Sequence, residues 1–493
     1  MSIDTNSDHY QKGLELAEAG RLSEAFDILQ GYLRAAPNNP EILNDIGAIL
    51  HAIGQTNEAI GHFSRALSLQ PDSVQIMWNL SEAYLAVGRA KDAVELFGDM
   101  ERIGIFNADI LNRAANVFLE QDDKANAVEM LLRSLQMSPG QAVLEPMIKV
   151  IRSKRPKVAF FCGGDGMTFL NDIVGFVEER FEVRIFSDGT DTRLPEAMEW
   201  CDICWFEWCT NIAVAASKMP KMCKTIVRLH RYEAYEQWPQ KVNWQNIDVL
   251  LTVGNEVTIQ ALKDKVPSIE SQTSLEVIPN GVDLSRFEFR ERPRGKNIAF
   301  LANLRMVKNP AFAIQCMQKL HYIDPEYRLF FAGDFQDDVL EQYLMHMVDT
   351  LGLRDVVFFD GAQSDVNSWL QDKHFIILTS VCEGQPVGVL EAMACGLKPV
   401  IHNFLGAECI FPREFLFNIA EEFCEQIISD QYEPHRYRKF VEEKYSLTRQ
   451  LCSVGKLFAR LENEIGAGSG RSAINISSVG EFRMPAFQNV GIK

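Results

Sequence analysis

The stretch FIILTSVCEGQPVGVLEAMACGLKPV, residues 375–400, decides how the second half of this chain folds. Its first residues predict a buried strand, the loop that follows leads into a short helix from about Pro386, and a second strand comes after Gly396, a residue type that commonly ends helices. One carboxylate, Glu383, lies in the loop and another, Glu391, in the helix. A helix start suits a phosphate and carboxylates suit sugar hydroxyls, so the stretch predicts a site for a sugar joined to a diphosphate.

The full motif is more specific than two carboxylates with seven residues between them, which would also fit a solvated loop and helix. The string EGQPVGVLEAMACGLKPV, residues 383–400, resembles the donor-site motif of family 4 glycosyltransferases, retaining enzymes of the two-domain GT-B fold. The resemblance implies that Glu383 accepts hydrogen bonds from donor-sugar hydroxyls and that Glu391 accepts them from ribose hydroxyls. It also implies roles for Gly384 in the donor loop and for Val387 and Gly388, whose backbone N–H groups would face the distal phosphate.

A basic segment upstream, NLRMVKNP at residues 303–310, supplies candidate phosphate ligands. The family usually has GRLxxxKG here, with the Arg and the Lys on the diphosphate. Lys308 matches the Lys, but Asn303 stands where the Arg is expected, so we expect Arg305 to take its place. Two solvated surface cations are the alternative interpretation. The resemblance also implies that the segment after Gly361 lies against the nucleotide base.

Short apolar runs alternate with helical segments through the last two thirds of the chain, which predicts two Rossmann-like α/β domains with parallel sheets. The predicted strands are Val158–Cys162, Val183–Phe186, Ile203–Phe206, Ile226–Leu229, Val249–Val253, Glu276–Ile278, Ile298–Ala302, Leu329–Ala332, Val356–Phe359, Phe375–Thr379 and Pro399–His402. Ligands of such sheets bind at the carboxyl ends of the strands. After the first strand comes a glycine-rich turn, a candidate acceptor or donor loop with a simple tight turn as the alternative. Its residues are Gly163, Gly164, Asp165 and Gly166.

Two further segments follow predicted strands. VRLHRYEAY, residues 227–235, resembles the family segment whose histidine contacts the donor sugar near the reacting carbon, which implies a catalytic role for His230. A structural histidine is the alternative. IPNGVD, residues 278–283, resembles the turn between the two halves of these enzymes, and Asn-Gly supplies the left-handed backbone of such a turn. We expect this segment to form the interdomain hinge.

The first 150 residues repeat with a period of 34 residues. The repeating positions are Ala25, Ala59, Ala93 and Ala127, Gly20, Gly54 and Gly88, the small residues Gly13, Gly47, Ser81 and Ala115, and Pro37, Pro71 and Pro139. Each unit reads as two helices that cross at small residues and turn at the glycine. The pattern resembles the tetratricopeptide repeat, in four copies over about residues 6–139, with a capping helix around residues 142–151.

Stacked helix pairs of this kind form a concave groove that usually binds a peptide or protein. Residues 1–150 contain 21 Asp and Glu and 11 Lys and Arg, a net charge of −10. We therefore expect a basic or polar protein partner in the groove, and self-association is the alternative.

The composition narrows the class of protein. The formal net charge of −18 argues against nucleic acid or an anionic membrane as the main partner. No apolar run approaches the roughly 20 residues of a membrane-spanning helix, and the amino terminus has no signal pattern. The 11 cysteines form no framework, so we expect a cytoplasmic protein in which Cys201, Cys204 and Cys209 are buried thiols rather than metal ligands.

Together these patterns predict an α-helical tetratricopeptide-repeat solenoid followed by an α/β GT-B fold. The expected domains are residues 1–154 for the repeats, 155–284 for the acceptor-side half, 285–464 for the half that binds the nucleotide sugar, and 465–493 for a disordered tail.

The resemblance implies a retaining, hexosyltransferase-like enzyme whose co-substrate is a UDP- or GDP-linked sugar. We expect no metal and no cofactor, because Lys308, Arg305 and a helix end would hold the phosphates and the chain has no Asp-x-Asp motif. The repeats favour a protein acceptor. A surface polysaccharide, a lipid-linked glycan, or a scaffold with an inactive transferase domain are the alternatives.

Overall fold

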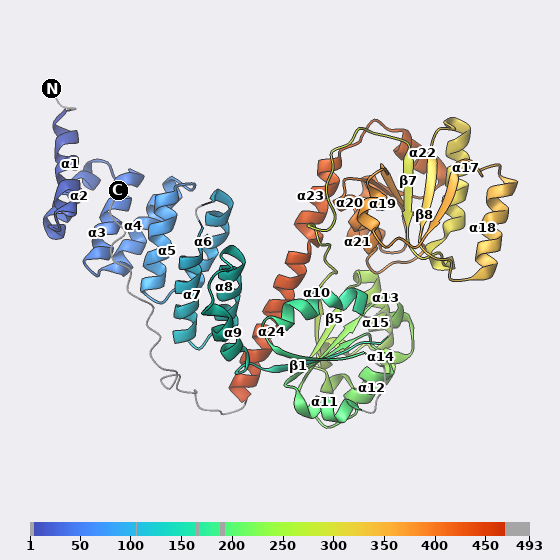
Figure 1. Cartoon of the computed structure of the whole chain (residues 1–493), viewed down its shortest axis with the longest axis horizontal. Helices are drawn as coiled ribbons and strands as arrows, with labels where there is room; N and C mark the ends of the chain where they lie inside the picture. The colour runs from blue at the N-terminus through green and yellow to red at the C-terminus, as the bar shows by residue number, and fades with distance from the viewer. Residues whose placement is uncertain (1–3, 105, 164–166, 188–192, 469–493) are drawn as a thin grey trace. The chain divides into compact units, whose positions relative to one another are not determined.

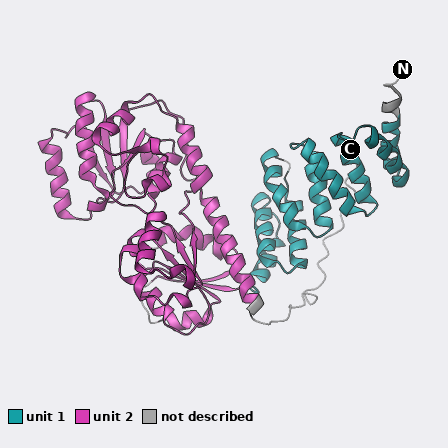
Figure 2. Ribbon diagram, turned by 180° about the vertical axis from the view of Figure 1, so that it is seen from behind, with its two compact units in different colours: residues 1–155, 471–493 teal, residues 156–470 magenta. Residues whose placement is uncertain are grey.

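The structure is a computed structural model that describes residues 4–104, 106–163, 167–187 and 193–468 (Figure 1). The chain separates into two compact units, and the boundary between Arg155 and Pro156 lies beside the junction expected from the sequence (Figure 2). Within the described ranges, no helix combines the length and the apolar character needed to cross a membrane.

The first unit is a run of paired helices, as the 34-residue period predicts. Its described helices are α1 (Asp4–Glu18), α2 (Leu22–Ala35), α3 (Pro40–Ala52), α4 (Thr56–Leu69), α5 (Val74–Ala86), α6 (Ala90–Ile103), α7 (Ala108–Glu120), α8 (Lys124–Met137) and α9 (Leu144–Arg152). The turns inside the first three pairs have left-handed backbone at Gly20, Gly54 and Gly88, with φ of +76°, +86° and +76°. In the fourth pair Asp122 takes this conformation with φ of +58°, which explains why the glycine pattern stops there.

Small residues stand where the helices of a pair cross. A Cβ atom added at Gly47 would lie 2.7 Å from the ring of Phe63, and one at Gly13 would lie 2.8 Å from the Leu29 side chain. The equivalent Ser81 and Ala115 are fully buried. The repeating small positions therefore mark close helix contacts, and the stack is confirmed as a tetratricopeptide-type arrangement.

The second unit begins with a parallel six-stranded sheet in the order β2-β1-β3-β4-β5-β6. Its strands are β1 (Lys157–Phe161), β2 (Glu182–Phe186), β3 (Ile203–Glu207), β4 (Lys224–Leu229), β5 (Val249–Thr252) and β6 (Ser274–Val277). The described helices between them are α10 (Met167–Glu178), α11 (Leu194–Trp200), α12 (Asn211–Ser217), α13 (Arg231–Tyr235), α14 (Trp238–Lys241), α15 (Glu256–Lys265) and α16 (Ile269–Gln272). Alternate strand residues enter different cores, so helices cover both faces of the sheet. Cys201, Cys204 and Cys209 are buried free thiols, as expected.

A second parallel six-stranded sheet follows, in the order β12-β11-β10-β7-β8-β9. Its strands are β7 (Asn297–Leu301), β8 (Arg328–Ala332), β9 (Val357–Gly361), β10 (Phe375–Leu378), β11 (Lys398–His402) and β12 (Leu416–Phe417). Its described helices are α17 (Pro310–Ile323), α18 (Asp338–Thr350), α19 (Val366–Leu370), α20 (Val387–Ala394), α21 (Ala407–Ile410) and α22 (Ala420–Ile428). Strand β12 was not predicted from the sequence, because two residues are too few to show a period. The two sheets together confirm the predicted GT-B architecture.

Two helices at the end of the chain return across both halves, as expected. Helix α23 (Pro434–Tyr445) joins the core of the second half through Tyr437 and Val441. Helix α24 (Leu447–Gly468) joins the core of the first half, where Phe458 stacks on Trp205. Helix α24 also runs into the start of the segment predicted as a disordered tail, and residues 469–493 lie outside the described part of the chain.

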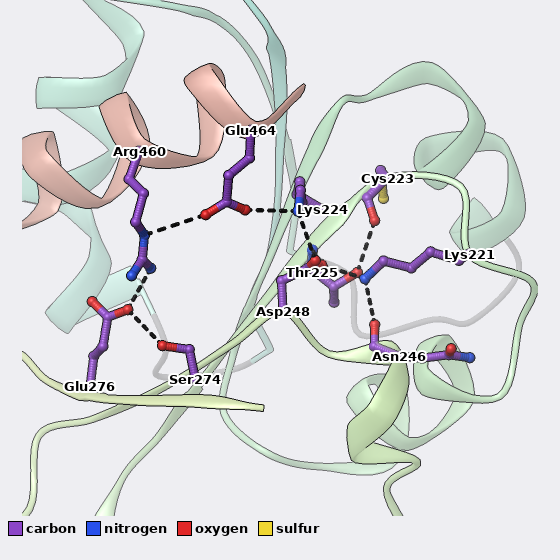
Figure 3. Close-up of polar contacts among 10 residues, drawn as sticks. All are labelled: Lys221, Cys223, Lys224, Thr225, Asn246, Asp248, Ser274, Glu276, Arg460 and Glu464. Carbon is purple, nitrogen blue, oxygen red and sulfur yellow. Dashed lines mark hydrogen bonds and ion pairs between the residues drawn. The ribbon is translucent and has the colours of Figure 1, made fainter. Parts of the chain in front are cut away.

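Polar contacts along α24 add to this packing (Figure 3). Lys224 Nζ lies 2.8 Å from Glu464 of α24 and 3.2 Å from Asp248, and Arg460 of α24 pairs with Glu276 of β6. Partly exposed pairs of this kind are worth only about 0–1 kcal/mol each. The buried apolar face of α24 therefore provides most of the attachment.

Candidate functional site

The stretch from residue 375 to residue 400 folds as predicted into strand, loop, helix and strand. Strand β10 leads into the loop, helix α20 begins at Val387, and Gly396 ends it with φ of +91°. Pro386 is the residue before the helix rather than its first residue. A Cβ atom at Gly388 would lie 2.9 Å from the carbonyl oxygen of Leu301, so the start of α20 packs closely against the end of β7. Glycine is needed for this approach.

Glu383 and Lys308, two predicted donor-site residues, point toward one another. Lys308 Nζ lies 2.6 Å from Glu383 Oε1, and the Ser380 hydroxyl donates to the same oxygen at 2.6 Å. The Glu383 residue is only 7 % exposed. The Thr379 hydroxyl donates to the carbonyl oxygens of Lys308 and Asn309, which ties the two loops together. A cation and an oriented carboxylate therefore stand side by side beside the start of α20.

The start of α20 offers fewer backbone donors than expected. The N–H of Val387 donates to the carbonyl oxygen of Gln385 at 3.0 Å, whereas the N–H of Gly388 has no partner within the described part of the chain. Glu391, on the same helix, is half-buried. Burial raises the pKa of Glu391 to about 7, although the charge of Arg286 acts in the opposite direction. This carboxyl group is therefore poised to gain or lose a proton near neutral pH.

His230 belongs to a buried ionic cluster. It follows β4, and its Nε2 lies 2.6 Å from Oε1 of Glu207, the last residue of β3. Arg228 Nη1 donates to the same oxygen at 3.1 Å. Burial acts to raise the pKa of Glu207, but Arg228 and His230 outweigh it and hold that pKa below its ordinary value. Burial also lowers the pKa of His230, so the ring is neutral near pH 7 and its Nε2–H donates to the ionised carboxylate.

The loop between β10 and α20, residues 379–386, is called the donor loop here, and it lies against the residues that follow β4 in the first half, His230 and Arg231. A Cβ atom at Gly384 would lie 3.0 Å from Cβ of Arg231, the residue after His230. Asn255 Nδ2 donates to the carbonyl oxygen of Glu383 at 3.3 Å. The structure therefore brings the segments of His230 and Glu383 together, and the absence of a side chain at Gly384 permits the approach.

Other predicted residues form no hydrogen bond with the Glu383 carboxylate within the described part of the chain, although the Arg305 carbonyl oxygen accepts from the N–H of Lys308 at 3.0 Å. Arg305 is exposed, and its guanidinium group forms no ion pair with any described residue. Gly361 ends β9 at the edge of the sheet, with β8 and β7 between it and β10. Gly163 follows β1, while residues 164–166 of the glycine-rich turn lie outside the described part of the chain.

Several polar residues that support this site were not predicted from the sequence. They are Ser380, Asn255, Gln385, Glu207 and Arg228. Two carried a usable signal, because Asn255 precedes a predicted helix as a typical N-cap and Glu207 is an acidic residue at the end of an apolar strand. Ser380 bonds Glu383 three residues away, but the partners of the other four lie 21 or more residues away in the sequence, so those contacts could not be predicted from it.

Comparison with known families agrees with this arrangement. Residues 282–415 match the family model described as "Glycosyl transferases group 1", and residues 50–103 match a tetratricopeptide repeat model. The chain carries a group 1 glycosyl transferase domain. This domain contains Lys308, Glu383 and Glu391, whereas His230 and its ionic cluster precede the matched residues.

Curated proteins that match part of this chain are named as transferases. The chain is 25 % identical over 155 residues to the UDP-Gal:alpha-D-GlcNAc-diphosphoundecaprenol alpha-1,3-galactosyltransferase of Escherichia coli. It is 26 % identical over 143 residues to the GDP-mannose:cellobiosyl-diphosphopolyprenol alpha-mannosyltransferase of Xanthomonas campestris. These matches span 29 % and 28 % of this chain and 40 % and 37 % of the relatives, so the similarity covers less than half the length of either relative.

A solved structure extends the similarity of fold beyond the glycosyl transferase domain. The crystal structure of Anabaena HepE in complex with UDP and glucose superposes with a TM-score of 0.52 at 15 % sequence identity. It covers 62 % of this chain and all of the Anabaena chain. At this identity the comparison supports the two-sheet fold alone.

Proposed function

We propose that this protein is a glycosyltransferase that moves a sugar from a nucleotide-diphosphate sugar to an acceptor. The observation that carries the proposal is the 2.6 Å contact between Lys308 and Glu383 beside the start of α20. An ammonium group has three donors, so Lys308 can keep this carboxylate and also bind a phosphate oxygen. Glu383 then remains oriented to accept hydrogen bonds from sugar hydroxyls.

In the proposed reaction the glycosidic bond to the diphosphate breaks while the acceptor approaches. Negative charge develops on the leaving diphosphate, and the charge of Lys308 and the Gly388 N–H stabilise it. On this basis we propose transfer without a metal ion. The family resemblance further favours retention of configuration by attack on the same face of a hexose, with a donor phosphate oxygen as the base and no carboxylate nucleophile.

The proposed acceptor is a protein held by the tetratricopeptide repeats in the cytoplasm. Repeat stacks present a concave surface, and the acidic balance of this one suits a basic or polar partner. A glycan acceptor is the second candidate, since two relatives of the domain are named for diphosphopolyprenol-linked saccharides.

Calorimetric titration of the full chain with UDP and GDP tests the donor proposal. We expect one of the two nucleotides to bind, because the names of the relatives include both UDP-Gal and GDP-mannose. A panel of UDP- and GDP-linked sugars assayed for slow hydrolysis then identifies the sugar. If neither nucleotide binds, the protein is a repeat scaffold with an inactive domain, and the enzyme proposal is wrong.

The affinity for the donor should depend on pH through Glu391. A carboxylate that accepts hydrogen bonds from ribose hydroxyls must be ionised, and with a pKa of about 7 it is half protonated at neutral pH in the free protein. Binding therefore releases a proton, and affinity should fall by about tenfold between pH 8 and pH 6. Calorimetry with an intact nucleotide sugar measures this slope, since its phosphates do not titrate in that range.

Glu391→Gln is the matched control for the pH dependence. Glutamine keeps the shape and one acceptor oxygen but has no proton to lose, so its affinity should be lower than that of the parent at pH 8 and nearly constant down to pH 6. An equal pH slope in the parent and in the variant would assign the titration to another group.

A further inference from the structure

Gln385 in the donor loop is bonded to the hinge between the two halves. The N–H of Asn280 donates to Gln385 Oε1 at 2.7 Å, and Gln385 Nε2 donates to the Asn280 carbonyl oxygen at 2.7 Å. A side-chain amide offers both the acceptor and the donor that this pairing needs, whereas a carboxylate lacks the donor. Asn280 lies in the segment between β6 and β7, so the donor loop is held in one register on the hinge.

The side chain of Asn280 continues the contact into the first half. Asn280 is 7 % exposed, and its Oδ1 accepts a hydrogen bond from Arg228 Nη2. Arg228 lies on β4, is 1 % exposed, and donates through Nη1 to Glu207 and to the carbonyl oxygen of Phe169. A buried guanidinium group requires such partners, because an unpaired buried charge is strongly destabilising.

The chain of contacts ends at His230. Glu207 accepts from Arg228 and from His230 Nε2 through Oε1, and from Trp205 Nε1 at 2.9 Å through Oε2. Hydrogen bonds therefore link Gln385, two residues after Glu383, to the backbone of Asn280, and a second set links the Asn280 side chain through Arg228 and Glu207 to the histidine on the other half. Asn280 joins the two sets through its own covalent frame, so a shift of its backbone also moves the side-chain oxygen that accepts from Arg228.

We propose that Gln385, Asn280 and Arg228 are positioning residues that hold the donor loop and His230 in register with one another. The kinetic part of this inference rests on the proposed function, whereas the structural part does not. Misplacement of a reacting group by about 1 Å can lower a rate by about 10²-fold. The three residues would act on the reaction through Glu383 and His230.

A double-mutant cycle tests the series. Gln385→Met keeps the length of the side chain but removes both bonds to Asn280, and Asn280→Ala removes only the bond to Arg228. We expect each variant to lower kcat for sugar transfer by about 10-fold to 100-fold, with little change in KM for the donor. Because both cut the same series, the double variant should be no slower than the slower single variant.

Gln315→Met is the matched control, since Gln315 is exposed on α17. It should retain the parental kcat, and thermal unfolding followed by circular dichroism should show that every variant is folded at the assay temperature. Losses that multiply in the double variant would overturn the inference. If Asn280→Ala does not fold, the nitrogen-15 NMR measurement on Gln385→Met, described next, tests the inference without it.

Nitrogen-15 NMR of the His230 ring gives a readout that needs no activity. The Nε2 resonance, assigned with His230→Gln, should shift in Gln385→Met and stay in place in Gln315→Met, because only the first variant disturbs the contacts that lead through Asn280 and Arg228 to Glu207 and His230. An unchanged resonance in Gln385→Met overturns the positioning role. Failure of the parent to turn over any nucleotide sugar instead contradicts the proposed function, so the two failures are distinguishable.

Discussion

Replacing Glu383 with alanine should lower the rate of sugar transfer by about 10³-fold. The variant loses the acceptor for the donor-sugar hydroxyls and also the oxygen that holds Lys308 Nζ and the Ser380 hydroxyl, each at 2.6 Å. Lys308 would then be free to leave the position in which it meets the diphosphate. Steady-state assays of transfer, or of donor hydrolysis before the acceptor is known, measure the loss.

Two controls separate this effect from unfolding. Glu425→Ala removes an exposed carboxylate on α22 and should retain the parental rate. Circular dichroism of Glu383→Ala should show the helical signal and the thermal transition of the repeat unit unchanged, and binding of a repeat partner should persist. A Glu383→Ala variant that transfers sugar at the parental rate would show that the donor site lies elsewhere.

Replacing Lys308 with methionine should lower kcat/KM for the donor by about 10²-fold to 10³-fold. Methionine fills the space of the lysine stem but carries no charge, so the leaving diphosphate loses its nearest cation in the proposed site. In the proposed site the nucleoside part of the donor does not contact Lys308. The variant should therefore lose more binding affinity for nucleoside diphosphates than for nucleosides. Calorimetry with the two ligands and steady-state kinetics together measure the effect.

Arg305→Met is the informative comparison for this second variant. Arg305 was expected to replace the family arginine, but it is exposed and forms no ion pair with a described residue, whereas Lys308 contacts Glu383. We expect Arg305→Met to cost less than tenfold in kcat/KM. A larger loss in Arg305→Met than in Lys308→Met would mean that Arg305 provides the main phosphate contact.

Much of the fold was predictable from local patterns. The repeat unit was visible because a 34-residue period places small residues at every helix crossing, as Gly13 and Gly47 show. Eleven of the twelve strands in the described ranges were predicted, because buried parallel strands are continuous apolar runs between helices. The exception was β12 (Leu416–Phe417), whose position depends on pairing with β11 rather than on its own sequence.

The part of the candidate site that lies on one short segment was predictable. Glu383, Gly388 and Glu391 lie on a single strand-loop-helix element, so their placement followed from the motif. The contact of Glu383 with Lys308 joins residues 75 apart and required the family resemblance. The occupied N–H of Val387 was not foreseen, because it depends on a local turn that the motif does not reveal.

The contacts between the halves were beyond sequence reasoning. Gln385 meets Asn280 across 105 residues, and Asn255 meets the Glu383 carbonyl across 128 residues. Neither contact produces a repeating pattern in the sequence. A single amide side chain in a loop is also typical of a solvated turn, so it does not indicate a contact. Their roles appear only when the two sheets are folded against one another.

The attachment of α24 to the first sheet has a consequence for biosynthesis. Val454, Leu457, Phe458 and Leu461 belong to the same buried cluster as β1 and β3, so this core is assembled from both ends of a long sequence interval. On the ribosome, the sheet around β1 must wait for α24, whereas the later sheet and α23 can be completed first. The nascent chain should therefore fold the half that contains β7 to β12 before the half that contains β1 to β6, in the reverse of their order in the sequence.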